Sequence, residues 1–254
     1  IIRWGDFKAT VLRACETRLL EIDRFITGQT ALEESPAQEQ AMAQDCVPTV
    51  SIVLPVDRID EKFARSLLMI QDQDYGNTDV VVVGDVSASE VANIAGGIGL
   101  GESIRVVRKQ TTSFSKLRNA GALSATGDYV AFVDSDVLWD KSFLSVCVKK
   151  AYESDVDLVY SSLRLRKSEV PWGSSLDDDR QLLHNRVCFG AALIARRVFN
   201  KEDLRFDEEK NGSYDHDLAL RLRNRIQFEY IASPLARHRV ANDEFATVSY
   251  THLT

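Results

Sequence analysis

The most informative feature of the sequence is a pair of aspartates, two residues apart, at the end of an apolar run. Residues 129–136 read YVAFVDSD, so Asp134 and Asp136 follow a segment typical of a buried strand. Residues two apart in extended backbone point to the same side, and both carboxylates would then face one divalent cation. Mg²⁺ or Mn²⁺ prefers such oxygen ligands and would fill its other positions with water and substrate phosphates. The alternative is a pair of turn-forming residues.

Short apolar runs alternate with helical patterns through the middle of the chain. Strands are predicted at 50–56, 80–83, 104–107, 129–133 and 158–161, and helices at 61–72, 114–125 and 141–153. This alternation predicts an α/β domain with a mostly parallel central sheet. Ligands of such sheets bind at the carboxyl ends of the strands, where Asp57, Asp85 and the Asp134/Asp136 pair all fall. We therefore expect a ligand site at that edge.

The order of these segments resembles the family 2 glycosyltransferases. The matching stretches are VSIVLPV (50–56), QDQDYGN (71–77), DVVVVGDVS (79–87) and SKLRNAGALSATGDYVAFVDSD (115–136). The resemblance implies a GT-A type, Rossmann-like fold. It also implies metal-dependent transfer of a sugar, with inversion, from a nucleotide diphosphate donor to an acceptor hydroxyl. In relatives the nucleotide is usually a uridine nucleotide. The implied cofactor is Mn²⁺ or Mg²⁺.

The resemblance assigns a nucleobase-binding role to Asp85. Relatives carry two acids here, of which the second accepts a hydrogen bond from the base, whereas this chain has Gly84 followed by Asp85. A cap of the turn between strand and helix is the alternative. Asp57 stands where the family commonly has an aromatic residue near the base. It either binds the nucleoside differently or is a turn acid.

Three residues near the start of the helix predicted at 114–125 resemble the family's diphosphate-binding segment. They are Lys116, Arg118 and Asn119, with Gly121 following. The first turn of a helix is electropositive, so cations there favour a bound diphosphate rather than the helix itself. The alternative is an ordinary solvated helical face. A glycine at position 121 would allow close packing against the sheet.

The candidate catalytic base is Asp215. It lies in NGSYDHDLALRLR (211–223), which resembles the family's Glu-Asp-x-Asp-Leu-x-Leu-Arg segment with Tyr214 in place of the glutamate. An acceptor hydroxyl is a poor nucleophile until a carboxylate takes its proton. Acids at the start of a helix are also ordinary caps, and we assign Asp217 to that structural role.

The candidate third metal ligand is His238, in PLARHRVAND. Many GT-A enzymes supply a histidine near this place, but the usual position falls at Ala241. A surface histidine is the alternative reading of His238.

Two other classes of protein compete with an active transferase. The departures at Asp57, Gly84, Tyr214 and Ala241 suit a catalytically inactive GT-A module that binds sugar nucleotides or acts as a scaffold. A nucleotidyltransferase typically has a glycine-rich basic loop after its first strand. No such loop follows Val56, which disfavours that class.

The sequence divides into three parts. Residues 1–47 form a predicted helical extension and linker, residues 48–247 the GT-A domain, and residues 248–254 a tail that fits no element and looks non-native. The chain opens without a methionine, so we expect a fragment.

Composition and charge limit the partners. The net charge of −7 argues against a nucleic-acid binder, which needs a basic surface. The four cysteines are scattered without CxxC spacing, as in a reducing compartment. No stretch reaches the roughly 18 to 20 apolar residues of a membrane span. We therefore expect a cytoplasmic enzyme of polysaccharide biosynthesis with a carbohydrate or lipid-linked acceptor, and any membrane association would lie in parts outside this chain.

Overall fold

The computed structural model describes residues 47–101, 103–165, 170–210 and 212–238. The chain divides into two units, Ile1–Val47 and Pro48–Thr254. The helical extension predicted for residues 1–47 lies outside the described residues except for Val47, and the predicted tail lies wholly outside them.

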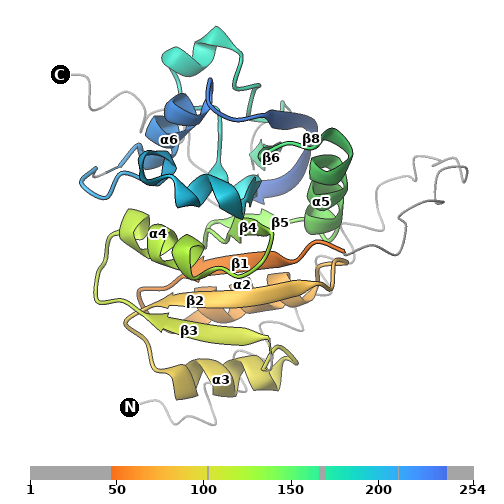
Figure 1. The fold of residues 1–254 in the computed structure, drawn as a ribbon. Coiled ribbons are helices and arrows are strands. Elements are labelled where there is room, and N and C mark those ends of the chain that lie inside the picture. Colours follow the sequence, from red (N-terminus) through yellow and green to blue (C-terminus); the bar gives the residue numbers. More distant parts are fainter. Residues whose placement is uncertain (1–46, 102, 166–169, 211, 239–254) are drawn as a thin grey trace, which may run out of the picture. The chain divides into compact units, whose positions relative to one another are not determined.

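The described part of the second unit is an α/β domain (Figure 1). Its strands are β1 (Val50–Pro55), β2 (Thr78–Gly84), β3 (Ile104–Arg108), β4 (Tyr129–Phe132), β5 (Val137–Trp139), β6 (Leu158–Leu165), β7 (Ala192–Ala195) and β8 (Phe228–His238). Its α-helices are α2 (Glu61–Gln71), α3 (Ala88–Gly97), α4 (Phe114–Ser124), α5 (Phe143–Ser154) and α6 (Tyr214–Leu222). Short 3₁₀ helices lie at Asp179–Leu182, Phe189–Ala191, Arg196–Asn200 and Glu202–Leu204.

The described strands form a single sheet in the order β3-β2-β1-β4-β7-β6-β8-β5. The first four are parallel to one another, as in a Rossmann-like half domain. β7 then runs antiparallel to both β4 and β6, β8 is parallel to β6, and β5 closes the edge antiparallel to β8. The predicted α/β class with a mostly parallel sheet is confirmed.

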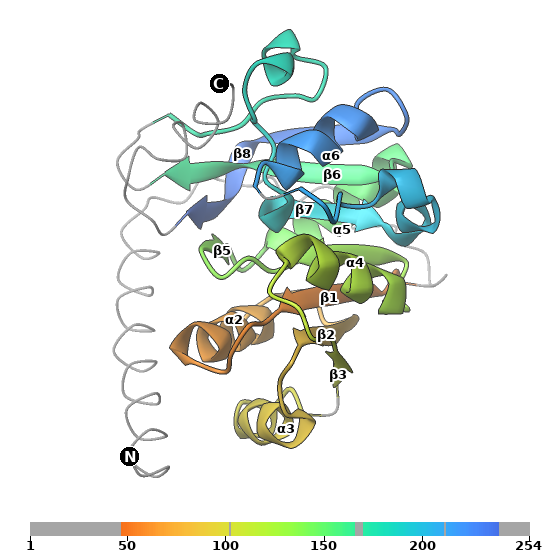
Figure 2. The same ribbon diagram turned by 90° about the vertical axis from the view of Figure 1, so that its left-hand side faces the viewer.

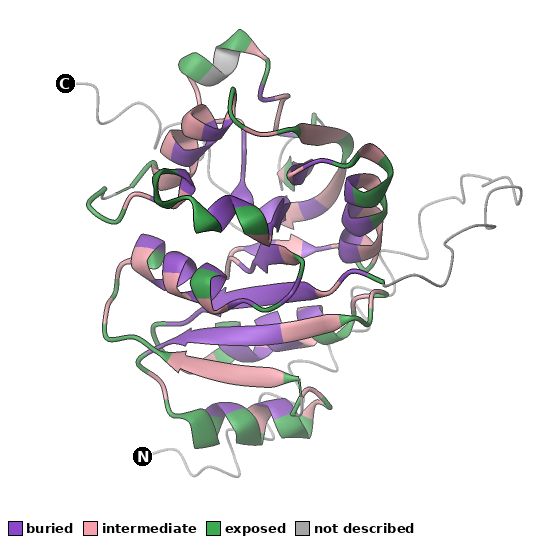
Figure 3. Cartoon of the chain, in the orientation of Figure 1, coloured by how far each residue is buried: buried purple, intermediate pink, exposed green. Residues whose placement is uncertain are grey.

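Helices cover both faces of this sheet (Figure 2). Apolar side chains of α2, α3 and α5 pack on one face, and those of α4 and α6 pack on the other. β1 is buried along its whole length, as Figure 3 shows, because it lies between two parallel neighbours under both layers. A Cβ at Gly121 of α4 would lie 2.2 Å from Val53 Cγ1, so α4 packs on the sheet only with glycine there.

Three elements differ from the prediction. α3 and the long strand β8 were not predicted, and β6 continues to Leu165, beyond the strand predicted at 158–161. Leu163 and Trp172 exchange two backbone hydrogen bonds of 2.8 Å, which hold the return segment against β6 and bury the indole. None of the helices described has the length and hydrophobicity needed to cross a bilayer.

Candidate functional site

Candidate acids gather at the carboxyl edge of the parallel strands. Because β1 pairs in parallel with both β2 and β4, the residues that follow these strands come out at the same edge. Asp57 follows β1, Asp85 follows β2 and Asp134 follows β4. Asp57 is exposed, and no ion pair joins it to a cation in the described part of the chain.

Asp134 and Asp136 lie in a turn rather than in extended backbone, which corrects the geometry expected from the sequence. Val137 N–H donates to the Asp134 carbonyl at 3.0 Å, and Asp136 N–H donates to Asp134 Oδ1 at 3.2 Å. The chain must turn here because β5 begins at once, at Val137. Both carboxylates are 34% exposed, so each offers oxygen atoms to solvent.

The buried side chain of Arg118 donates hydrogen bonds to two of the candidate acids. Its guanidinium donates from Nη1 to Asp215 Oδ1 at 2.7 Å and from Nη2 to Asp134 Oδ2 at 3.4 Å. The Arg118 side chain is only 2% exposed, and its Nε has no hydrogen-bond acceptor among the residues described. A buried guanidinium held by two carboxylates fixes their separation. The expected contact of Arg118 with a donor diphosphate remains a prediction.

Aromatic rings enclose the Arg118 guanidinium. Its Cζ lies 5.8, 5.2 and 5.1 Å from the ring centroids of Phe132, Phe206 and Tyr214 respectively. Cations are attracted to aromatic faces, most strongly where water is excluded. Tyr214, which replaces the family's glutamate, therefore contributes a ring beside the arginine where relatives carry a charge.

Asn119 anchors the backbone of Phe206, one of the three rings around the Arg118 guanidinium. The Asn119 amide donates to the Phe206 carbonyl at 2.8 Å and to Glu208 Oε1 at 3.0 Å, and its oxygen accepts from Phe206 N–H at 3.0 Å. The side chain is buried and thus faces the protein interior. The expected diphosphate contact of Asn119 remains a prediction, whereas its hydrogen bonds give it a structural role.

Asp215 lies in the first turn of α6, with a side chain 17% exposed. Its Oδ2 accepts from Phe189 N–H at 3.3 Å, and its Oδ1 accepts from Arg118. Burial raises the pKa of the Asp215 carboxyl, against the opposing effect of the Arg118 guanidinium, and the nearby Asp134 charge raises it further. A raised pKa strengthens a carboxylate as a proton acceptor.

The backbone before Asp215 is unusual. Gly212 and Ser213 have φ angles of +85° and +48°, and serine adopts the left-handed region at a steric cost. Such strain often accompanies a functional site. α6 begins directly after Ser213, and Asp215 in its first turn accepts a hydrogen bond from Arg118.

Asp217 serves the structure, as its ion pairs show. It pairs with Lys210, and it accepts from Arg221 at 2.7 and 2.9 Å. Although burial favours the protonated form, the hydrogen bonds from Lys210 and Arg221 hold the pKa of Asp217 below its usual value. Arg221 also donates to backbone carbonyls of Asp203 and Arg205, so this cluster ties α6 to the preceding loop.

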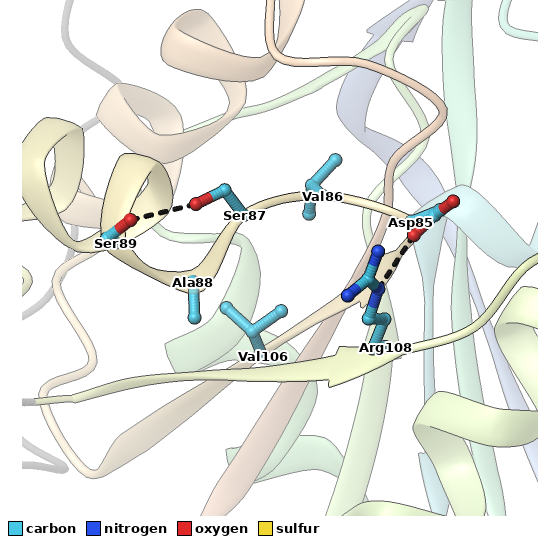
Figure 4. A pocket seen from close by; sticks show the side chains of 7 residues that line it. All are labelled: Asp85, Val86, Ser87, Ala88, Ser89, Val106 and Arg108. Carbon is cyan, nitrogen blue, oxygen red and sulfur yellow. Dashed lines mark hydrogen bonds and ion pairs between the residues drawn. The ribbon is translucent and has the colours of Figure 1, made fainter.

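A pocket lies at the end of β2 and β3 (Figure 4). It has a volume of about 460 Å³ and is lined by Asp85, Val86, Ser87, Ala88, Ser89, Val106 and Arg108. Arg108 Nε donates to Asp85 Oδ1 at 2.8 Å, with side chains 73% and 44% exposed. Solvent thus reaches both charged groups at the mouth of the pocket.

Steric crowding explains why glycine, rather than an acid, occupies position 84. A Cβ at this position would lie 2.0 Å from the Val56 carbonyl oxygen. An aspartate cannot replace Gly84 without moving the backbone after β1, so the first acid of the family's pair does not fit this chain.

Lys116 lies in the first turn of α4, and His238 is the last residue of β8. Lys116 Nζ lies 4.0 Å from Glu209 Oε1 and is 37% exposed. His238 ends β8, is buried, and pairs in register with Val137, the residue after Asp136. Within the described ranges, however, no three His, Cys, Asp or Glu side chains are grouped to hold a metal ion. Metal ligation by His238 remains a prediction.

Two basic residues near the acids were missed by the sequence reasoning. Arg108 ends β3, so the rule that led to the acids at strand ends also points to it. Lys62 is in the first turn of α2, and its Nζ lies 3.5 Å from Asp136 Oδ1. A lysine at the electropositive end of a helix was the available signal.

The family model described as Glycosyl transferase family 2 matches residues 51–225. The chain therefore belongs to glycosyltransferase family 2. Among curated relatives, the amylovoran biosynthesis glycosyltransferase AmsB of Erwinia amylovora is 29% identical over 75% of this chain and 69% of its own length. A PGL/p-HBAD biosynthesis glycosyltransferase of Mycobacterium bovis is 28% identical over 60% of this chain, which spans 61% of that relative.

Solved structures share the fold. Residues 1–349 of S. aureus TarS in complex with UDP-GlcNAc match with a TM-score of 0.63 at 18% identity, covering 80% of this chain and 62% of that one. Mannosyltransferase PcManGT from Pyrobaculum calidifontis, in complex with GDP-Man and Mn²⁺, matches with a TM-score of 0.56 at 17% identity, covering 94% and 68%. The domain thus has the GT-A architecture of glycosyltransferases.

Proposed function

We propose that the chain transfers a sugar from a nucleotide diphosphate donor, with UDP as the nucleotide, to an acceptor hydroxyl with inversion. The observation that supports this proposal most strongly is that Arg118 bridges two carboxylates, a contact we call the Arg118 bridge. It holds Asp134, at the end of a parallel strand, and Asp215, at the start of α6, on one guanidinium. A transferase needs one group for the donor diphosphate and another that takes the proton of the acceptor hydroxyl, and Arg118 holds a candidate for each role.

The donor would lie along the carboxyl edge from β3 to β4. Asp85 and Arg108 flank the pocket proposed for the base, where a carboxylate oxygen accepts from a ring N–H. The diphosphate would extend past Asp57 toward Asp134 and Asp136, with Lys116 at the start of α4 as a cation for it. The UDP-GlcNAc held by TarS supports a uridine nucleotide as the first donor to test.

Asp134 and Asp136 fit a divalent cation by their chemistry. They offer partly exposed carboxylate oxygens, and an ammonium group already lies at one of them. When bound, Mn²⁺ or Mg²⁺ would neutralise negative charge on the departing diphosphate.

Asp215 would act on the acceptor. As the acceptor oxygen bonds to the anomeric carbon, the bond to the diphosphate oxygen breaks and the hydroxyl proton passes to the Asp215 carboxylate. Attack opposite the leaving group gives inversion. We propose a carbohydrate or lipid-linked acceptor; the curated relatives are named for amylovoran biosynthesis and for PGL/p-HBAD biosynthesis.

A second candidate function is a sugar-nucleotide-binding module without turnover. One observation favours it: both oxygens of Asp215 already accept hydrogen bonds, from Arg118 and from Phe189 N–H. The Asp215 side chain is also only 17% exposed, so an acceptor hydroxyl has little access to the remaining lone pairs of its oxygens. Donor binding is common to both functions, and only turnover separates them.

Donor binding is tested by a thermal shift screen of sugar nucleotides with Mn²⁺. A donor present at 100 times its Kd stabilises the native state by about 2.7 kcal/mol. We expect Asp85→Ala to weaken UDP binding by about 1–3 kcal/mol, because the base then loses a hydrogen-bond acceptor. Isothermal calorimetry with UDP and Mn²⁺ measures this loss.

Asp79→Ala is the matched control for Asp85→Ala. Asp79 pairs with Arg105 at 3.0 Å across the same two strands, but toward the start of β2 and outside the pocket. We expect this variant to lose stability while binding UDP normally. Equal UDP affinity in the parent and Asp85→Ala would leave Asp85 as a turn residue.

A further inference from the structure

Lys62 lies at the second aspartate of the proposed cation site. Its Nζ is 3.5 Å from Asp136 Oδ1, a contact between α2 and the turn after β4. Among the described residues, Lys62 alone forms an ion pair with Asp136. The lysine and aspartate side chains are 51% and 34% exposed, so solvent and solutes reach both.

The local structure of α2 does not explain a lysine at this position. Asp60 caps the helix, and its Oδ1 accepts from Lys62 N–H at 2.8 Å and from Phe63 N–H at 3.1 Å. These bonds fix the Lys62 backbone in the first turn, where the helix dipole disfavours a cation. A residue that violates its local preference in this way often has a functional reason.

We propose that the Lys62 ammonium is a resident counter-ion of Asp136 that competes with the divalent cation. The inference rests on the proposed function, because it assumes that Asp134 and Asp136 are the cation's ligands. Lys62 occupies an oxygen that the cation needs, and its charge repels a second cation nearby. The pair is exposed, and such pairs are weak, so the divalent cation displaces the ammonium at a modest cost in affinity.

The test is the affinity for Mn²⁺ alone, measured by the loss of the free-ion electron paramagnetic resonance signal. We expect Lys62→Gln to bind Mn²⁺ roughly 1.4- to fivefold more tightly than the parent, the range set by an exposed ion pair. Lys62→Arg keeps the charge and should bind Mn²⁺ with an affinity close to that of the parent. A melting curve for each variant verifies that folding is unchanged.

Arg58→Gln is the matched control, and Asp136→Asn tests the site itself. Arg58 is exposed, pairs with Asp60 at 3.2 Å and makes no ion pair with Asp136. The inference is overturned if Lys62→Gln binds no more tightly than the parent, or if Arg58→Gln tightens binding equally. If those results come with loss of Mn²⁺ binding in Asp136→Asn, the proposed cation site stands and Lys62 alone is wrong. Unchanged Mn²⁺ binding in Asp136→Asn would overturn both.

Discussion

Replacing Asp215 with asparagine is expected to lower the rate of sugar transfer by roughly 10²–10⁴-fold while leaving donor affinity nearly unchanged. The amide cannot accept the acceptor proton, but it retains the size of the carboxylate and can still accept a hydrogen bond from Arg118. The measurement is turnover of the bound sugar nucleotide at saturating concentration, alongside calorimetry of donor binding.

Asp217→Asn provides the control for this variant. Asp217 lies two residues further along α6 and is held by Lys210 and Arg221 rather than by Arg118. Its loss should lower stability without a comparable loss of rate. If Asp215→Asn turned over at the parent rate, the base would have to be another residue.

Arg118→Met is expected to destabilise the protein by about 3–5 kcal/mol. Methionine fills part of the aromatic cage, but the variant leaves the largely buried Asp215 carboxylate without its cation. Lys116→Met is the matched control, since Lys116 lies on the same helix with its side chain 37% exposed and should change stability little. Urea unfolding midpoints measure both effects.

The double variant Arg118→Met with Asp215→Asn separates the charge effect from packing. Removing the carboxylate charge as well should recover part of the lost stability, because no buried anion remains unpaired. A loss below about 1 kcal/mol in Arg118→Met alone, within the range of exposed ion pairs, would show that the bridge is not a buried charge pair.

Local pattern was sufficient to predict the parallel half of the sheet. The strands β1 to β4 are short apolar runs separated by helical segments. β1, β2 and β4 are largely buried under two layers of helices, which leaves that pattern in the sequence. β8 left no such pattern, since Phe228–His238 contains Pro234 and is only partly buried through most of its length. α3 ends in Gly96-Gly97, which lowers its helix propensity.

The sequence was sufficient to predict which acids lie at the carboxyl edge, but not the hydrogen bonds that join the site residues. The parallel pairing of β1 with β2 and β4 brings Asp57, Asp85 and Asp134 to one edge of the sheet, as the pattern of predicted strands indicated. The bond between Arg118 and Asp215 joins residues 97 positions apart, and sequence does not reveal which way a helical side chain points. The turn at Asp134–Asp136 could not be predicted from the sequence either, because it depends on the short strand β5 pairing with β8.

We propose that the acids of the carboxyl edge and Asp215 form one catalytic site for a nucleotide diphosphate sugar. The decisive measurement is the release of nucleotide diphosphate from the best-bound donor, with Mn²⁺, in the parent, Asp136→Asn and Asp215→Asn. We predict release by the parent and severe loss in both variants, with donor binding lost only in Asp136→Asn. A parent protein that binds the donor but releases no more nucleotide than the two variants would contradict the claim and leave a binding module.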